Sequence, residues 1–464
     1  MYKSKLYKIL KVFSTYELEM LNNYINDPNF NKHDKVKELF TYIQLNFDSL
    51  VALEKEKVFK KLFPKEKFND LKLRHLMSYT LKLVEEFGYI QIEKQNSFEP
   101  IYKQLSFYSE KDFTKGIEET QYSFNTTLEK SKINTPQESY TKYNIYTLFY
   151  NHSIKSNRTE IGLLQELNKS LDEFFILSKL KVACSIVNQQ AIFNQTINDG
   201  FFKDILEFTQ SNYLQNPMIA LYYHIYKLIL ENKIEQYIPT HDSFNTCLAI
   251  KNKLEIKDAL LLLINFCIRQ INQGNKEFEK RVFDHYKIGI EFEILLDKNK
   301  LSPFTYSNAV NIAIKQNEIE WVEVFIEKYK NNLDTENPED YYALNKSKYL
   351  VAIKKYSEAL DFINKTDIQD LLTQLQLRII QLKIFIELDE YNLAESFIAN
   401  FKQMLKRKNI LAYHKTNFSK IAKYMTKLIH LAPYATKAKE KLILDISNEK
   451  VLSEKAWFIE KLSQ

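Results

Sequence analysis

The phrase YSEALDFI at residues 356–363 is nearly repeated as YNLAESFI at residues 391–398. Tyrosine, alanine, phenylalanine and isoleucine recur at the same four places, each with an offset of 35 residues. A third copy, IEWVEVFI at residues 319–326, lies 37 residues before the first phrase and keeps its apolar positions. Because the shared residues in each copy have helical spacing, a fixed offset of this size predicts stacked helical hairpins.

The composition indicates the same architecture. Of 464 residues only 6 are glycine and 9 are proline, while 45% are hydrophobic and 27% are charged, which is a normal globular balance. Sheets need tight turns, and tight turns favour residues such as glycine that adopt positive φ. We therefore predict an all-α fold whose helices are joined by short loops rich in asparagine, aspartate and lysine. The length fits two or three domains or one elongated array.

The block from residue 301 to 407 resembles the tetratricopeptide repeat, a helix-turn-helix unit of about 34 residues. The resemblance lies in the second helix of each unit, where a large residue is followed by alanine three positions later and by a large apolar residue after four more. This pattern is carried by Tyr356, Ala359, Ile363, Tyr391, Ala394 and Ile398. The first helices depart from the family at its small-residue and tryptophan positions, which here hold Val310, Ser347, Leu382, Tyr306, Ala343 and Arg378.

The resemblance implies a right-handed superhelical array of antiparallel helix pairs with a concave face that binds peptides or protein segments. It implies no catalytic residue. We divide the chain into an N-terminal helical module over 1–95, a helical hairpin array over 96–240, tetratricopeptide-like repeats over 241–407 and basic capping helices over 408–464. The array is either one continuous superhelix or two blocks hinged near Pro239.

The N-terminal module has two interpretations. Ser14 to Glu17 form a capping-box pattern, and a longer helix starts at Asn69 or Asp70 and is predicted to end at Gly88. Residues 89–93 then alternate like a short strand, so that the module loosely resembles a winged-helix DNA reader. Its recognition helix would carry Lys72, Arg74, His75 and Lys82. Alternatively, the module is a polar cap for the array, with these charges in solvent.

The middle of the chain reads as further helix pairs. Residues 159–198 are predicted to hold two helices, split near residues 171–173. Residues 239–252 are predicted to be a connecting segment, and residues 272–275, which contain Gly274, a turn between helices.

The sequence offers little catalytic chemistry. No two of the six glycines are closer than 15 residues, so neither a P-loop nor a dinucleotide-binding loop can be formed. Cys184, Cys247 and Cys267 lie among apolar residues and are predicted to be buried, reduced thiols. The eight histidines have no paired metal-ligand spacing. We therefore expect a non-enzymatic protein without a cofactor or a metal.

The chain shows no targeting signal. Its N-terminus places a lysine every two or three residues and lacks the apolar core of a signal peptide. No apolar run approaches the roughly 18 residues of a membrane span. These features predict a cytoplasmic protein with no membrane partner.

The C-terminal region is strongly basic. Between residues 402 and 441 there are ten lysines and Arg407 against Glu440 alone, a local net charge of +10, whereas the whole chain carries +6. A stripe of this kind can bind phosphate backbones or an acidic protein segment, or it can be a solvated helix face. The residues predicted for an anionic partner are Lys420, Lys423, Lys427 and Tyr424.

Two functions follow from these features. The first is a protein–protein interaction scaffold that binds a partner segment in its concave groove. Its partner-binding residues are predicted on the first helices of the two best repeats, at Asn345, Lys348, Gln381 and Lys383. The alternative is a nucleic-acid-associated regulator that uses the basic C-terminal helices, the N-terminal module or both. An enzyme is the third possibility, and the sequence shows no site for it.

Overall fold

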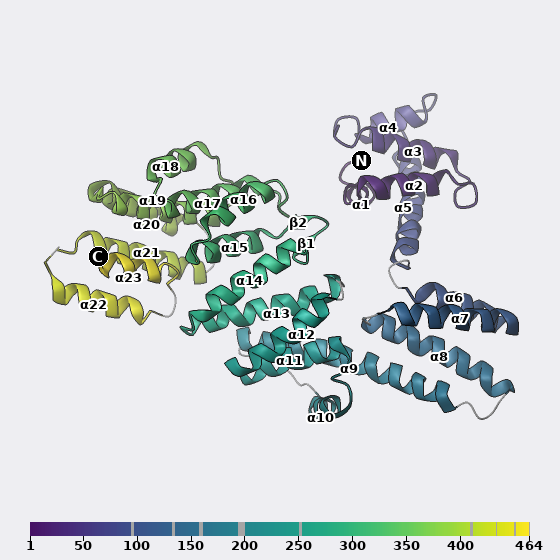
Figure 1. The fold of residues 1–464 in the computed structure, drawn as a ribbon. Coiled ribbons are helices and arrows are strands. Elements are labelled where there is room, and N and C mark those ends of the chain that lie inside the picture. The colour runs from purple at the N-terminus through teal and green to yellow at the C-terminus, as the bar shows by residue number, and fades with distance from the viewer. Residues whose placement is uncertain are drawn as a thin grey trace. The chain divides into compact units, whose positions relative to one another are not determined.

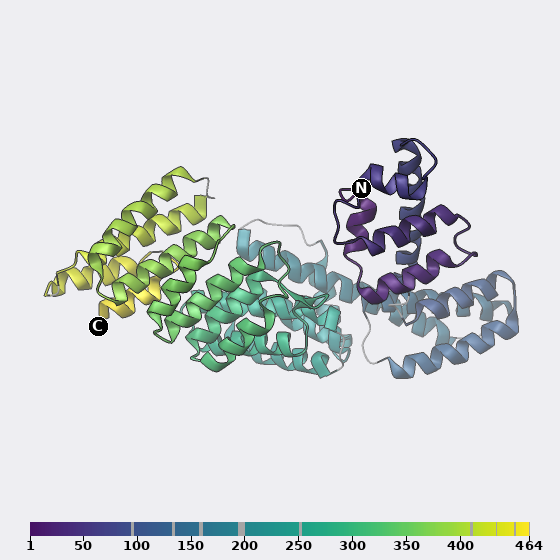
Figure 2. The ribbon, with the colours of Figure 1, turned by 90° about the horizontal axis from the view of Figure 1, so that it is seen from above.

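A computed structural model describes residues 1–93, 97–131, 135–156, 161–193, 200–249, 253–408, 412–432, 434–449 and 452–463. Within these residues the chain forms 23 α-helices, one short 3-10 helix (Ile234–Gln236) and one hairpin of two-residue strands (Figures 1 and 2). The predicted all-α fold class is confirmed. Among the described helices, none is both long enough and apolar enough to cross a membrane.

The chain divides into two compact units. Unit 1 comprises residues 1–186 and 195–223, and unit 2 comprises residues 187–194 and 224–464. The division falls within two helices, α9 (Ile161–Phe193) and α11 (Pro217–Glu231). The other helices of unit 1 are α1 (Lys5–Lys11), α2 (Thr15–Asn26), α3 (Asp34–Leu45), α4 (Lys55–Leu62), α5 (Asp70–Glu93), α6 (Glu99–Glu110), α7 (Thr114–Lys130), α8 (Pro136–Ser156) and α10 (Phe202–Asn212).

The first 93 residues have a hydrophobic core of their own. The long helix α5 contacts each of α1 to α4, and their buried side chains form one apolar cluster. The predicted capping box is present at the start of α2. The Ser14 side chain accepts a hydrogen bond from the Glu17 backbone at 3.2 Å, and the Glu17 carboxylate accepts one from the Ser14 backbone at 2.7 Å.

The end of this module was predicted wrongly. Helix α5 continues through Gly88 to Glu93, so residues 89–93 are helical, and the described part of the module contains no strand. Val84 and Phe87 are buried in the module's core, and packing of these residues outweighs the roughly 1 kcal/mol that a glycine costs within a helix. Because residues 89–93 are helical, they do not form the strand that the winged-helix interpretation requires as its wing.

Two predictions for the middle of the chain are also wrong. Residues 171–173 lie inside the single helix α9, so the predicted split is absent. Residues 239–249 are helical, because Pro239 lies in the first turn of α12 (Tyr237–Ala249), where its missing N–H leaves no helical hydrogen bond unmade. The remainders of the two predicted segments, residues 159–160, 194–198 and 250–252, fall outside the described residues.

Unit 2 continues as successive helix pairs. The turn predicted at Gly274 is present and joins the helix that ends at Asn272 to the helix that begins at Glu277. The hairpin of two short strands was not predicted. The elements are α13 (Lys253–Asn272), α14 (Glu277–Glu291), β1 (Leu296–Asp297), β2 (Lys300–Leu301), α15 (Pro303–Lys315), α16 (Ile319–Tyr329), α17 (Pro338–Ala352), α18 (Tyr356–Lys365), α19 (Leu371–Glu387), α20 (Tyr391–Arg407), α21 (Ala412–Ile429), α22 (Thr436–Ser447) and α23 (Lys455–Ser463).

The repeated phrase marks the second helix of three hairpins. Helices α16, α18 and α20 begin at Ile319, Tyr356 and Tyr391, which are the first residues of the three copies. Each contacts the first helix of its own pair, which is α15, α17 or α19 respectively. Each also contacts the helix that follows it. The prediction that the copies are helices at equivalent places is therefore confirmed.

The same turn joins the two helices of each pair. Asn317, Lys354 and Asp389 all have φ close to +58°, in the left-handed region, and each lies two residues before the second helix. In the middle hairpin, the Lys354 N–H donates to Val351 at 2.9 Å and the Lys355 N–H donates to Leu350 at 2.9 Å. The other two turns have the equivalent pair of bonds, which is the Schellman pattern that ends many helices. These turns therefore reverse the chain without glycine.

We predict that Lys354→Gly raises the melting temperature of the chain. A non-glycine residue with positive φ costs on the order of 1 kcal/mol, and glycine removes that cost. Lys354 is exposed, so no packing is lost. The control is Lys328→Gly, within the last turn of α16, which should lower stability by about 0.5–1 kcal/mol. Thermal unfolding followed by circular dichroism distinguishes the two, and equal destabilisation by both variants would contradict the assigned turn.

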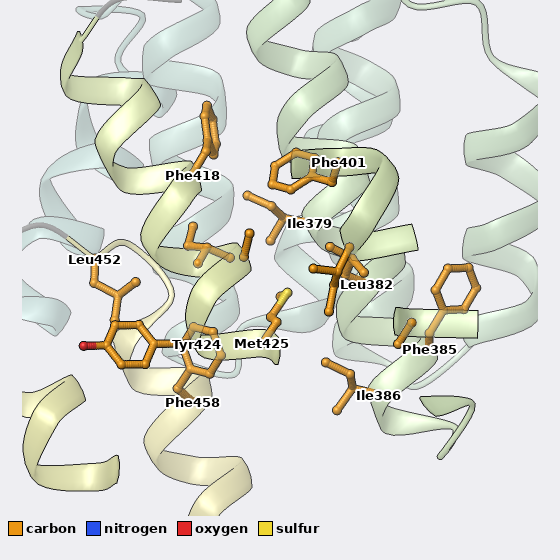
Figure 3. Packing of buried hydrophobic residues seen from close by; sticks show 14 of the residues in the cluster. Ile379, Leu382, Phe385, Ile386, Phe401, Phe418, Tyr424, Met425, Leu452 and Phe458 are labelled. Carbon is orange, nitrogen blue, oxygen red and sulfur yellow. The ribbon is translucent and has the colours of Figure 1, made fainter. Parts of the chain in front are cut away.

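The end of unit 2 has a continuous apolar core. It joins α19, α20 and α21 to the two C-terminal helices (Figure 3). Leu382 and Ile386 of α19 lie on one side, Phe401 comes from α20, and Met425 of α21 and Phe458 of α23 complete it. All five side chains are at most 2% exposed. Helices α21, α22 and α23 are therefore packed onto the last hairpin through this core.

We predict that Gly289→Ala destabilises the chain. Gly289 lies on α14, and a Cβ atom there would come within 2.6 Å of the Leu295 side chain and 2.8 Å of Leu260 Cδ2, both buried. Overpacking of this kind costs about 1–3 kcal/mol. Gly88→Ala on α5 is the control, because no atom lies within 4 Å of its Cβ position and alanine favours the helix. A lowered melting temperature for the first variant only is expected, and the absence of any difference would contradict the close contact.

Candidate functional site: the first-helix row

The first helices α15, α17 and α19 form a row in which each helix contacts the next. The offsets of 37 and 35 residues place Asn311, Lys348 and Lys383 at equivalent positions along this first-helix row. Phe304 and Tyr341 are equivalent in the same way and lie on the same face, two turns nearer the start of their helices. Two of the four residues predicted for partner binding, Lys348 and Lys383, therefore lie on one line.

Asn345 is a structural residue in this conformation. Its side chain is fully buried, and its Nδ2 donates to Ser307 Oγ at 3.0 Å and to the Tyr341 carbonyl at 2.7 Å. Its Oδ1 has no hydrogen-bond partner in the structure. The bond to Ser307 links α17 to α15. Asn345 is thus unavailable to a partner, because the close packing of the two helices covers it.

Gln381 is also occupied within the fold. Its side chain is 9% exposed, and its Nε2 donates to Asn364 Oδ1 at 3.0 Å. Asn364 belongs to the last turn of α18, so the bond ties α19 to the preceding second helix. The repeat offset aligns Gln381 with Lys346, which pairs with Glu327 at 2.9 Å, again on a second helix. Gln381 and Lys346 thus each connect a first helix to the second helix of the preceding pair.

The end of the row at α19 is covered by the C-terminal helix. Lys383 Nζ lies 3.0 Å from Glu454, just before α23, and 5.2 Å from the centroid of the Trp457 ring. Glu387 accepts hydrogen bonds from Trp457 Nε1 at 2.9 Å and from Lys461 Nζ at 3.0 Å. Phe458, the residue next to Trp457, has its ring in the apolar core (Figure 3). Lys383 is therefore engaged with the chain itself.

Lys348 has an unusual environment. Its side chain is half-buried, and desolvation lowers the pKa of its ammonium from 10.5 to about 8. Glu454 favours the charged form, but Lys383 lies close enough to oppose it and already pairs with that carboxylate. Among the described residues Lys348 itself forms no ion pair, and Glu454 is already bound by Lys383. A second carboxylate placed beside Lys348 would relieve the repulsion.

The other end of the row is open. Phe304 is 73% exposed on the first turn of α15, and Asn311 is exposed two turns later. Tyr341 is half-buried on α17. Neither Phe304 nor Asn311 is among the residues predicted for partner binding, because that prediction covers only the two best-matching repeats. The offset of 37 residues from Lys348 was the signal that could have identified Asn311.

We predict that Lys348→Met stabilises the chain at pH 7. The folded-state pKa of about 8 lies below the ordinary value, so the unfolded state binds more protons between about pH 8 and 10. Stability of the wild type therefore rises with pH in this window, and the variant loses that rise. At pH 7 the gain should be about 1–2 kcal/mol, since part of the side chain stays in water. Denaturant unfolding measures it, with exposed Lys365→Met as the control; an unchanged pH profile would contradict the assignment.

Three of the four residues predicted for an anionic partner already contact carboxylates of the same chain. Lys420 and Tyr424 both bind Glu449, at 2.6 and 2.8 Å, and Lys427 lies 3.5 Å from Asp445. Tyr424 is only 3% exposed, and burial, followed by its bond to Glu449, raises its pKa to about 12. Tyr424, although predicted for an anionic partner, has its ring packed into the core of unit 2.

The charged face of α5 is partly neutralised as well. Lys72 pairs with Glu66 at 2.7 Å, and Arg74 pairs with Asp70. His75 and Lys82 are exposed. Two of the four charges proposed to contact DNA therefore have carboxylate partners within the module.

The described residues contain no group of three or more side chains arranged to hold a metal ion. The three cysteines are buried and form no disulfide, as predicted. Burial raises the pKa of Cys247 and Cys267 to about 12. A thiol with so high a pKa is a poor nucleophile at neutral pH.

Comparison of the chain with protein-family models, with curated proteins and with solved structures gives no match.

Proposed function

We propose that this chain is a cytoplasmic, non-enzymatic scaffold of the helical-repeat type that binds a segment of another protein. In this proposal residues 301–407 form a tetratricopeptide-like, right-handed superhelix, and the first-helix row is its concave face. One observation supports it most. The first helices contact one another directly, while each second helix contacts the first helices on either side of it. A row that is closely packed on one side and more widely spaced on the other favours curvature toward the first helices.

The open end of the row provides the chemistry for a peptide ligand. Phe304 offers an exposed aromatic anchor, and Asn311 offers an amide that can both donate and accept hydrogen bonds. Lys348 adds a cation that lacks a carboxylate of its own. These groups suit a partner segment with an apolar side chain and a nearby acidic residue. The buried Asn345 and Gln381 support the row, and Lys383 holds the C-terminal helix against it.

The test compares two alanine variants of exposed apolar residues in the full-length chain. Phe304→Ala alters the first-helix row, and Val324→Ala alters α16, where Val324 is 66% exposed. Each variant and the wild type would be cross-linked in the native cell, and bound proteins quantified by mass spectrometry. We expect at least one protein whose recovery falls about tenfold or more with Phe304→Ala, which is typical of an anchor residue, and is unchanged with Val324→Ala.

Loss with both variants, or with neither, would contradict the proposed face. Circular dichroism of the purified variants should show the wild-type melting temperature, since both side chains are exposed. A captured protein would then be tested with Lys348→Gln. Weaker binding of a partner that carries an acidic residue, and no change for one in which that residue is neutralised, is the expected result.

A further inference from the structure

We propose that the solvent face of α21 is a second binding site, which holds the phosphate groups of a nucleic acid. The site is a shallow depression of about 450 Å³ that is lined by Lys415, Thr416, Ser419, Lys420 and Lys423. Every one of these side chains ends in a hydrogen-bond donor, and none carries a negative charge. The proposal does not depend on the scaffold function.

Helical spacing brings the lining residues together. Phe418, Ala422 and Met425 are buried and fix the inner face of α21 against the core of unit 2. Lys415 and Lys423 are exposed on the outer face, two turns apart. At a rise of about 1.5 Å per residue they are separated by roughly 12 Å along the axis. Their ammonium groups can thus contact two separate phosphates.

The charges around this face are unbalanced. Glu449 is bound by Lys420 and by Tyr424, and Asp445 pairs with Lys427. Lys423 lies near enough to Glu449 to help lower the pKa of that carboxyl, but less than Lys420 does. Among the described residues, Lys415 and Lys423 form no ion pair.

Glu449 and Asp445 are therefore already paired with other lysines of α21. The lining residues belong to the segment from 402 to 441, which carries a local charge of +10. Lys406, Arg407 and Lys408, at and just after the end of α20, are exposed and add further positive charge. An external polyanion would balance this charge and release bound counterions.

The surface favours phosphates over an acidic protein. Protein interfaces depend on apolar or aromatic anchors, and no large exposed hydrophobic side chain occurs among the described side chains of α21. Lysine and hydroxyl groups are typical contacts to a phosphate backbone. With Tyr424 buried, the described part of this face offers no exposed ring for base stacking. The site should therefore bind the backbone without reading the sequence.

The test measures binding of the full-length chain to a fluorescent 20-nucleotide single strand and to a 20-base-pair duplex by anisotropy, over a series of salt concentrations. We expect affinity to fall steeply with salt and to be equal for two unrelated sequences. The variant Lys415→Gln with Lys423→Gln should weaken binding at low salt on the order of tenfold and make the logarithmic salt slope shallower by about two. Both lysines are exposed, so the melting temperature should not change.

Two further variants make the test specific. Lys115→Gln with Lys130→Gln removes the same charge from exposed positions on α7 and should leave binding and slope unchanged. Glu449→Gln frees Lys420 and should tighten binding. The Phe304→Ala variant should bind nucleic acid as the wild type does, which separates this site from the proposed scaffold face.

The proposal would be overturned by the absence of binding at low salt. Equal losses in the α7 control would overturn it too, because they would indicate a general charge effect. Binding to polyglutamate or to vesicles rich in phosphatidylserine, with the same affinity as to the oligonucleotides, would reject nucleic acid as the ligand.

Discussion

The helix pairs of residues 303–407 depend on a chain reversal that uses one residue with positive φ. At Asn317, Lys354 and Asp389 two backbone hydrogen bonds close the end of the first helix and direct the chain into the second. The same geometry recurs between α6 and α7 at Asp112, and between α13 and α14 at Gly274. Because the bonds come from the backbone, the residue at the turn is free to vary. That freedom explains how a chain with so few glycines builds so many tight hairpins.

The turns bring the first helices into a row, and the row is used differently at its two ends. At α19, Lys383 and Glu387 bind the C-terminal helix, and the apolar core continues into it. At α15, the aromatic ring of Phe304 remains exposed. Lys348 lies on α17 between them, with a lowered pKa, and Glu454, which favours its charged form, is already paired with Lys383. The α19 end of the row therefore contributes to stability, and we propose that the α15 end binds the partner.

The sequence predicted the helices best where apolar spacing and repetition agreed. Ile319, Tyr356 and Tyr391 each open a helix, and the Ser14 capping box is present. Short patterns failed, because an alternation of five residues after Gly88 cannot distinguish a strand from the last turn of a long helix. The candidate site was harder to predict. Glu449 lies 29 and 25 residues from Lys420 and Tyr424, and such pairings depend on tertiary packing that no local pattern reports.

The two proposed surfaces differ in chemistry as well as in place. The first-helix row has an aromatic anchor and polar groups, as a protein partner requires, whereas α21 presents cations without apolar neighbours. We propose that the first-helix row binds a segment of another protein. Hydrogen exchange of the full-length chain, measured with and without a purified partner, tests it most directly. Slower exchange in α15 and α17, with no change in α16 and α18, is the predicted result. Protection confined to α16 and α18 would contradict the account.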